Sequence, residues 1–205
     1  MSTLQGPVCP LPHNHEEKIV LGHGSGGKMM TKLITHIFHP PLANPILQAG
    51  NDAGVVHPPK ATKLAISTDA HVVYPLFFPG GDIGRLAICG TVNDVAMMGA
   101  IPHYLTASFI LEEGLEMTTL QKVVESMQTA AEEAEVQVIA GDTKVVEKGK
   151  ADGLYIATTG VGTLIEGHTV GGERAQPGDV VIVSGTIGDH GIAVLEARGD
   201  LGFQS

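Results

Sequence analysis

Residues 63–99 read KLAISTDAHVVYPLFFPGGDIGRLAICGTVNDVAMMG and contain the pattern that decides the fold. The β-prone run KLAIST at the start of this stretch predicts a strand that ends at Asp69. After a loop rich in proline and glycine, Asp82 is placed to cap a helix that runs to about Gly99. The stretch therefore predicts a strand, a loop and a helix, and Asp94 lies on that helix.

Strands and helices alternate on both sides of this stretch. Apolar residues at helical spacing follow a glycine-rich run, and prolines then stop that helix and open a loop. Thr118 and Gln121 have the spacing of a capping box before a second long helix. This alternation indicates an α/β or α+β architecture. The other expected elements are an extended segment and glycine loop at 19–27, a helix at 28–38 that ends before Pro40, Pro41 and Pro45, strands from Tyr104, Val136 and Gly153, and a helix with Leu120, Val124, Met127, Ala131 and Ala134 on its apolar face.

The two ends of the chain differ from its central part. Residues 1–18 are polar and rich in proline, which favours a flexible leader. Near the other end, a turn at 177–179 precedes an expected strand, VVIVSG, and an expected helix, TIGDHGIAVLEAR. The 205 residues correspond to about 1.4 domains of typical size. We therefore expect one domain at 19–170 and the beginning of a second at 171–205.

The composition excludes several classes of protein. The 22 acidic and 12 basic residues give a formal net charge of −10, which disfavours binding to nucleic-acid phosphates. With 43% hydrophobic residues the chain can bury a sizeable core. It has neither a signal-peptide pattern nor an apolar run of about 18 residues. Cys9 and Cys89 cannot make a disulfide framework, which fits a reducing compartment. We expect a cytoplasmic protein that binds neither nucleic acid nor a membrane.

Aspartates occur where the expected strands and helices give way to loops or where small residues line a helix. Carboxylate oxygens of this kind suit Mg²⁺, which proteins usually share with nucleotide phosphates. Each aspartate taken alone is also a common turn or capping residue, and this alternative stays open. The candidate metal ligands are Asp52, Asp69, Asp94 and Asp142.

The glycine-rich run GHGSGGK occupies residues 22–28 and opens an expected helix. Backbone N–H groups at such a helix start can hold an anion, and Lys28 adds positive charge. The run is not a Walker A motif, because the spacing differs and Met29 follows the lysine. An ordinary glycine turn is equally compatible with these residues.

Asp142 and Lys144 are separated by one residue at the end of an expected strand. If the strand continues, alternation places both side chains on the same face. A carboxylate for a metal and an ammonium for a phosphate are a combination that suits phosphoryl transfer. A surface ion pair is the open alternative.

The remaining candidates have simpler interpretations. The histidines form no zinc-binding pair at helical spacing. His71 and His190 lie near the aspartates and are interpreted as solvated loop residues, with contact to a ligand as the open alternative. Cys89 lies in an apolar helical stretch and is interpreted as a small buried residue. The small residues of the same helix, including Gly90, are also compatible with a dimer face.

Several segments together resemble one known family. They are GHGSGG, STDAHVVYPLFFPGGDIGRLAICGTVNDVAMMGAIP, FILEEGL, GDTKVVEKG and VSGTIGDHGIAVL. They resemble the HypE family of hydrogenase maturation proteins, within the PurM-like superfamily of ATP-binding proteins related to aminoimidazole ribotide synthetase. The resemblance runs from about Val20 to Leu201 and is far more specific than any single motif.

The resemblance implies a PurM-like N-terminal α/β domain with a mixed sheet packed by helices. The first strand and helix of a PurM-like C-terminal domain would follow it. In this superfamily the N-terminal domain dimerises through its strands and binds ATP partly across the subunit boundary. The implied cofactors are ATP and Mg²⁺. The implied partners are a second copy of the chain, the carbamoyltransferase HypF and the HypC–HypD complex.

The resemblance also implies an activity. HypE-type proteins receive a carbamoyl group from HypF on the thiolate of a C-terminal cysteine and use ATP to dehydrate it to a thiocyanate. The cyano group becomes a cyanide ligand of the iron in the [NiFe] hydrogenase centre. An amide oxygen is a poor leaving group, so the γ-phosphoryl group must first be moved onto it while cationic groups neutralise the triphosphate.

Individual residues receive roles from the same resemblance. Asp94 and Lys144 are the implied catalytic residues, and Lys144 would lie near the transferred phosphoryl group. The loop at 22–27 would cover the phosphates. The implied metal ligands are Asp52, Asp69, Asp94 and Asp142, and the implied nucleotide contacts are Gly24, Ser25, Gly26, Gly27, Asp69, Asn93, Asp94, Asp142 and Thr143.

The sequence departs from the family at its end. Family members are longer and end in the cysteine that carries the substrate, whereas this sequence ends LGFQS. We therefore expect this polypeptide to bind nucleotide and dimerise without completing the dehydration. Two other interpretations stay open: another PurM-like ATP enzyme of selenophosphate, thiamine-phosphate or purine metabolism, and a non-catalytic, dimerising, ATP-binding interaction module.

Overall fold

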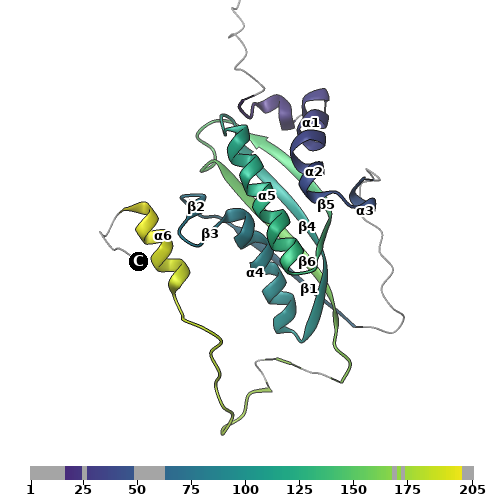
Figure 1. Ribbon diagram of the computed structural model, residues 1–205, viewed down its shortest axis with the longest axis vertical. Coiled ribbons are helices and arrows are strands. Elements are labelled where there is room, and N and C mark those ends of the chain that lie inside the picture. Colours follow the sequence, from purple (N-terminus) through teal and green to yellow (C-terminus); the bar gives the residue numbers. More distant parts are fainter. Residues whose placement is uncertain (1–16, 25–26, 49–62, 168–169, 172–173, 200–205) are drawn as a thin grey trace, which may run out of the picture.

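The computed structural model forms a sheet with helices packed on one side (Figure 1). Helices α4 (Ile83–Met97) and α5 (Met117–Glu133) lie next to each other across this side. None of the helices that the structure describes is long and apolar enough to cross a membrane. The structure describes residues 17–24, 27–48, 63–167, 170–171 and 174–199.

The sheet of the described residues has four strands in the order β1-β6-β4-β5. Strands β4 and β5 are parallel, and the other neighbouring strands are antiparallel. This mixed sheet confirms the predicted fold class. The strand bounds are β1 (Leu64–His71), β4 (Ala100–Glu112), β5 (Gln137–Val146) and β6 (Leu154–Leu164).

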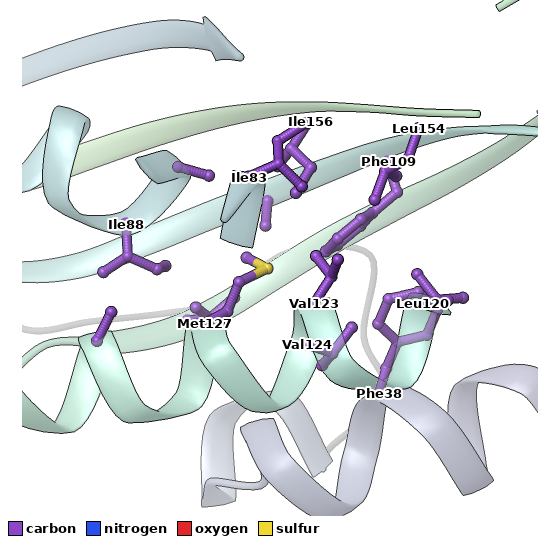
Figure 2. Close-up of a cluster of buried hydrophobic side chains, with 14 of the residues drawn as sticks. Phe38, Ile83, Ile88, Phe109, Leu120, Val123, Val124, Met127, Leu154 and Ile156 are labelled. Atoms are coloured by element: carbon purple, nitrogen blue, oxygen red, sulfur yellow. The ribbon is translucent and has the colours of Figure 1, made fainter. Parts of the chain in front are cut away.

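The hydrophobic core lies between the helices and the sheet. Apolar residues of α5 recur at the spacing of one helix face, which gives the helix a stripe to bury. Figure 2 shows this stripe packed toward Phe109 of β4 and toward Leu154 and Ile156 of β6. The predicted apolar face is confirmed, and Val123 and Ala130 are buried on it as well.

Asp82 fixes the start of α4, as the sequence predicts. Its carboxylate accepts hydrogen bonds from the backbone N–H groups of Gly84 at 2.7 Å and Arg85 at 3.2 Å. Its other oxygen accepts a hydrogen bond from Ser126 Oγ on α5 at 2.5 Å. One side chain therefore caps α4 and links it to α5. A short hairpin of β2 (Phe77–Phe78) and β3 (Gly81–Asp82) precedes the cap.

The predicted capping box at the start of α5 is wrong. The N-cap residue is Glu116, and it makes no side-chain bond to the helix. Its carboxylate pairs instead with the Lys18 ammonium at 2.7 Å. Thr118 and Gln121 consequently lie inside the helix.

The prediction that prolines stop the first helix is also wrong. After α1 (Lys28–Leu33), a π-helical turn, η2 (Ile34–Phe38), leads directly into α2 (His39–Leu42). Pro40 and Pro41 occupy the first turn of α2, and Pro45 is the first residue of α3 (Pro45–Gln48). First-turn positions tolerate proline because their N–H groups have no intrahelical acceptor.

The C-terminal part confirms the expected turn and helix but not the expected strand. Residues 177–178 form the predicted turn and α6 (Asp189–Arg198) the predicted helix, with His190 against Phe78 of β2 at 5.3 Å between ring centroids. The expected strand after the turn is wrong. Its residues Val180–Val183 pair with no strand that the structure describes, and Val181 is 89% exposed. A lone strand has no partner for its backbone N–H and C=O groups, which explains why none forms.

Candidate functional site

Polar side chains from β1 and α4 meet at one edge of the sheet. Ser67, Asp69 and His71 alternate along β1, so all three point toward the helix-covered face. Ser67 Oγ donates a hydrogen bond of 3.0 Å to Asp94 Oδ2 on α4. We call Ser67, Asp69, His71 and Asp94 the β1–α4 cluster. The structure thus brings two predicted ligands, Asp69 and Asp94, to the same place.

Gly90 explains how α4 can lie so close to β1. A Cβ atom at this position would stand 3.0 Å from His71 Cε1 and 3.3 Å from Asp69 Oδ2. Asp94 follows Gly90 by four residues, so both lie on the same side of the helix. The absence of a side chain at Gly90 therefore lets Asp94 reach Ser67.

Asp69 lies inside β1 and not at its end, contrary to the prediction. Its Oδ1 accepts a hydrogen bond of 2.8 Å from the Ala70 N–H, and its Oδ2 lies 3.8 Å from His71 Nε2. The side chain is 45% exposed, so its oxygens remain accessible to a ligand.

His71 is a buried strand residue, and its interpretation as a solvated loop histidine is wrong. Its side chain is only 4% exposed. Burial lowers the pKa of His71, and the negative charges of Asp69 and Asp94 oppose that shift. A lowered pKa means that the imidazole is neutral at pH 7.

Asp142 and Lys144 form a second polar group, on β5. The prediction that both lie on one face is confirmed, because Asp142 Oδ2 and Lys144 Nζ are 3.6 Å apart. Both side chains are exposed, and both residues lie within β5, which continues to Val146. Thr143 lies between them, points to the other face and is 5% exposed.

The sheet register separates the two groups. Asp69 pairs with Thr158 on the helix-covered face, whereas Asp142 pairs with Ser108 on the open face. Strands β1 and β5 are also the outer strands, about 14 Å apart at the usual spacing. The predicted carboxylates therefore form no single cluster within one chain. The described part holds no group of three or more His, Cys, Asp or Glu residues placed to bind a metal ion. Asp52 lies outside the described residues.

The glycine-rich run lies against β5, close to the Asp142–Lys144 pair. Its first part forms η1 (Leu21–Gly24), and a Cβ atom at Gly24 would stand 2.8 Å from the Val145 backbone nitrogen. Glycine is therefore required where this segment meets the residue after Lys144. Gly27 is the N-cap residue of α1, which confirms the predicted helix start. The predicted contacts Ser25 and Gly26 lie outside the described residues.

Two further residues of α4 complete the site description. Asn93 is exposed beside Asp94. Cys89 packs against the core as predicted, although it is partly and not fully buried. Burial raises the pKa of the Cys89 thiol, and the nearby Arg85 opposes that shift. The thiol is therefore protonated at pH 7 and is a poor nucleophile.

Sequence reasoning missed Ser67 and the buried threonines behind the cluster. Thr158 Oγ1 lies 3.2 Å from His71 Nε2 and 2.6 Å from Thr91 Oγ1. The alternation of Ser67, Asp69 and His71 was the available signal, since all three face α4 once β1 extends to His71.

The fold and the carboxylates of Asp69, Asp94 and Asp142 agree with one class of protein. The family described as "AIR synthase related protein, N-terminal domain" matches residues 50–164. The chain belongs to this family.

Within that class, the chain is similar to hydrogenase maturation proteins. It is 51% identical over 188 residues to the carbamoyl dehydratase HypE of Cupriavidus necator, covering 92% of this chain and 54% of the relative. A crystal structure of HypE in complex with ATP matches with a TM-score of 0.86 and 49% identity, over 90% of this chain and 55% of that one. HypE in a HypE–HypF complex matches with a TM-score of 0.68 and 51% identity, over 84% and 55% of the two chains. The chain thus spans a little over half the length of these relatives.

Proposed function

We propose that this chain forms the ATP-binding part of a HypE-type carbamoyl dehydratase in [NiFe] hydrogenase maturation. The observation that carries the proposal is the match over 90% of the chain to a HypE crystallised with ATP. The carboxylates of Asp69 and Asp94, both on the side where β1 meets α4, support it, because a nucleotide-bound cation needs oxygen ligands. The full reaction converts a carbamoyl group on a cysteine thiol to a thiocyanate, the source of the cyanide ligand of the iron.

The chemistry of this dehydration defines what the chain must do. The carbamoyl oxygen takes the γ-phosphoryl group of ATP and then leaves as phosphate, while two N–H protons are removed and the carbon–nitrogen bond becomes triple. The products are the thiocyanate, ADP and phosphate, and no oxidant or reductant is consumed. Bound Mg–ATP supplies the phosphoryl group, so the protein's task is positioning and charge neutralisation.

The residues of the β1–α4 cluster fit a hard cation such as Mg²⁺. Asp69 and Asp94 offer carboxylate oxygens, and Ser67 holds one oxygen of Asp94 in place. Lys144 would neutralise charge near the transferred phosphoryl group, with Asp142 orienting its ammonium.

We also propose that two copies of the chain pair through the open face of the sheet. Several large apolar side chains are exposed on this face, and such a group of exposed apolar residues is typical of an interface. The β1–α4 cluster lies on the opposite face of the sheet from this interface, but β1 is an outer strand. Pairing that lays β5 of one copy along the β1 edge of the other would bring Asp142 and Lys144 near that cluster around the edge of the sheet. Each nucleotide site would then consist of the β1–α4 cluster of one copy and the Asp142–Lys144 pair of the other. The exposed large apolar residues of this face are Leu64, Ile66, Ile101 and Ile110.

The same proposal covers the organisation and partners of the protein. Residues 1–18 would be a leader, 19–170 the ATP-binding and dimerisation domain, and 171–205 the beginning of a second domain. The match to HypE in a HypE–HypF complex supports HypF as a partner. A HypC–HypD complex would receive the cyano group, and all of these reactions would take place in the cytoplasm.

Calorimetric titration of the purified chain with Mg–ATP tests the nucleotide site. We expect saturable binding that Asp94→Asn weakens by about 10-fold or more, because it removes a charged ligand. Asp152→Asn is the matched control, since Asp152 is an exposed residue of the β5–β6 connection. It should bind as the wild type does. Unchanged affinity in a folded Asp94→Asn variant would overturn the proposed site.

A further inference from the structure

We infer that His71 is a positioning residue for Asp69, held by a chain of buried hydroxyl groups so that its protonated Nε2 stays beside the Asp69 carboxylate. The inference rests on the proposed function, in which Asp69 binds a nucleotide-associated cation. It assigns a role to a histidine that does not itself contact the ligand.

The hydrogen bonds of Thr158 determine which nitrogen of His71 carries the proton. The single hydroxyl proton of Thr158 is donated to the carbonyl oxygen of Ala87 at 3.1 Å. Thr91 must therefore be the donor in its 2.6 Å bond to Thr158 Oγ1. The remaining lone pair of Thr158 Oγ1 then accepts from His71 Nε2 at 3.2 Å. Because Thr158 has no second proton, the neutral His71 ring carries its hydrogen on Nε2.

This tautomer directs the Nε2–H at Thr158 and places its partial positive charge near Asp69. His71 Nε2 lies 3.8 Å from Asp69 Oδ2, which is too long for a hydrogen bond but close enough for charge–dipole attraction. The other oxygen, Oδ1, is held by the Ala70 N–H. Both oxygens of the carboxylate thus have a defined neighbour, although the side chain is 45% exposed.

Close packing leaves the imidazole little freedom to turn away. A Cβ atom at Gly90 would stand only 3.0 Å from His71 Cε1, so the backbone of α4 covers that edge of the ring. On the other side the ring is fixed by Thr158 of β6. Groups that orient a ligand from behind in this way typically change ligand affinity by about 10- to 100-fold when removed.

The tautomer can be measured on the free chain by ¹⁵N NMR of the histidine side chains. The chain contains ten histidines, and the signals missing from His71→Gln identify those of His71. We expect the protonated nitrogen to be Nε2 at pH 7. Thr158→Val removes the acceptor without changing the shape of the side chain, so it should shift the ring toward a mixture of tautomers. A ring protonated on Nδ1 in the wild type would overturn the inference.

Substitutions of His71 separate positioning from packing. The amide nitrogen of Gln can occupy the position of His71 Nε2, whereas that of Asn reaches only the position of Nδ1. In titrations with Mg–ATP, we expect His71→Asn to weaken binding by about 10-fold and to need more Mg²⁺ for half-saturation. His71→Gln should restore most of the affinity.

The results distinguish the possible failures. Equal affinities of folded His71→Gln and His71→Asn variants would overturn positioning through Nε2, because a purely structural role does not distinguish them. If the wild type does not bind Mg–ATP, the proposed function is overturned instead. The NMR measurement then decides by itself whether His71 is held in the stated orientation.

Discussion

Replacing Gly84 by alanine should force α4 away from α5. Gly84 lies in the first turn of α4, where the helix backbone touches α5. An added Cβ atom would stand 2.3 Å from the carbonyl oxygen of Val123 and 3.1 Å from Met127 Cγ. The Val123 oxygen belongs to the helix backbone and cannot rotate away, so the two helices must separate.

The size of the effect follows from two opposing contributions. The 2.3 Å contact is about 1 Å shorter than an ordinary contact, and overpacking of this kind costs up to about 3 kcal/mol. Alanine has a better helix propensity than glycine by about 1 kcal/mol. We therefore expect a net loss of about 2 kcal/mol in the free energy of unfolding, or a melting temperature lower by about 4–8 °C.

Urea unfolding followed by circular dichroism measures this loss. Gly191→Ala is the matched control, because Gly191 is also in the first turn of a helix and a Cβ atom there meets nothing within 4 Å. The control should be as stable as the wild type or slightly more stable. A Gly84→Ala variant as stable as the wild type would refute the claim that the close contact between α4 and α5 requires glycine.

Three further predictions follow from the contacts described above. Asp82→Ala removes the cap of α4 and should lower the free energy of unfolding by about 1–2 kcal/mol in the same urea assay. The backbone N–H groups of Gly149 and Gly153 lower the pKa of Glu112 below its usual 4.5, so this carboxylate stabilises the fold above that pH and loses the effect as the pH falls through its lowered pKa. Glu112→Gln should therefore be less stable than the wild type at pH 7, and the difference in thermal midpoint should vanish at strongly acid pH. Val181→Lys interrupts an exposed apolar run and should reduce concentration-dependent light scattering; unchanged scattering would show that this run does not drive association.

The elements that the sequence predicts well are those whose pattern is repeated over several turns or residues. The apolar stripe of α5 and the alternation in β6 each supply several agreeing positions, and Asp82 supplies a local cap. The prolines of α2 misled the prediction because a π-helical turn places them at first-turn positions, which sequence spacing does not reveal. The strand expected at Val180–Val183 has the right composition but no partner among the described residues.

The site was only partly predictable. Asp69 and Asp142 resemble turn residues, yet each lies inside a strand, because an outer strand can leave polar side chains on either face partly exposed. Their assignment to opposite faces depends on the pairing of β1 with β6 and of β4 with β5, which spacing along the chain does not encode. The meeting of Asp94 with Ser67 depends on Gly90, whose role became visible only from the packing of α4 on β1.

The central claim is that a nucleotide site is shared between two copies of the chain. Mixing the Asp94→Asn variant with the Lys144→Ala variant tests it most directly. Each site would take Asp94 from one copy and Lys144 from the other, so a mixed dimer would contain one intact site and one site with both substitutions. We predict that each variant alone loses tight Mg–ATP binding and that the equimolar mixture, after subunit exchange, regains about a quarter of the wild-type sites. Variants that exchange subunits and yet regain no binding when mixed would contradict the account.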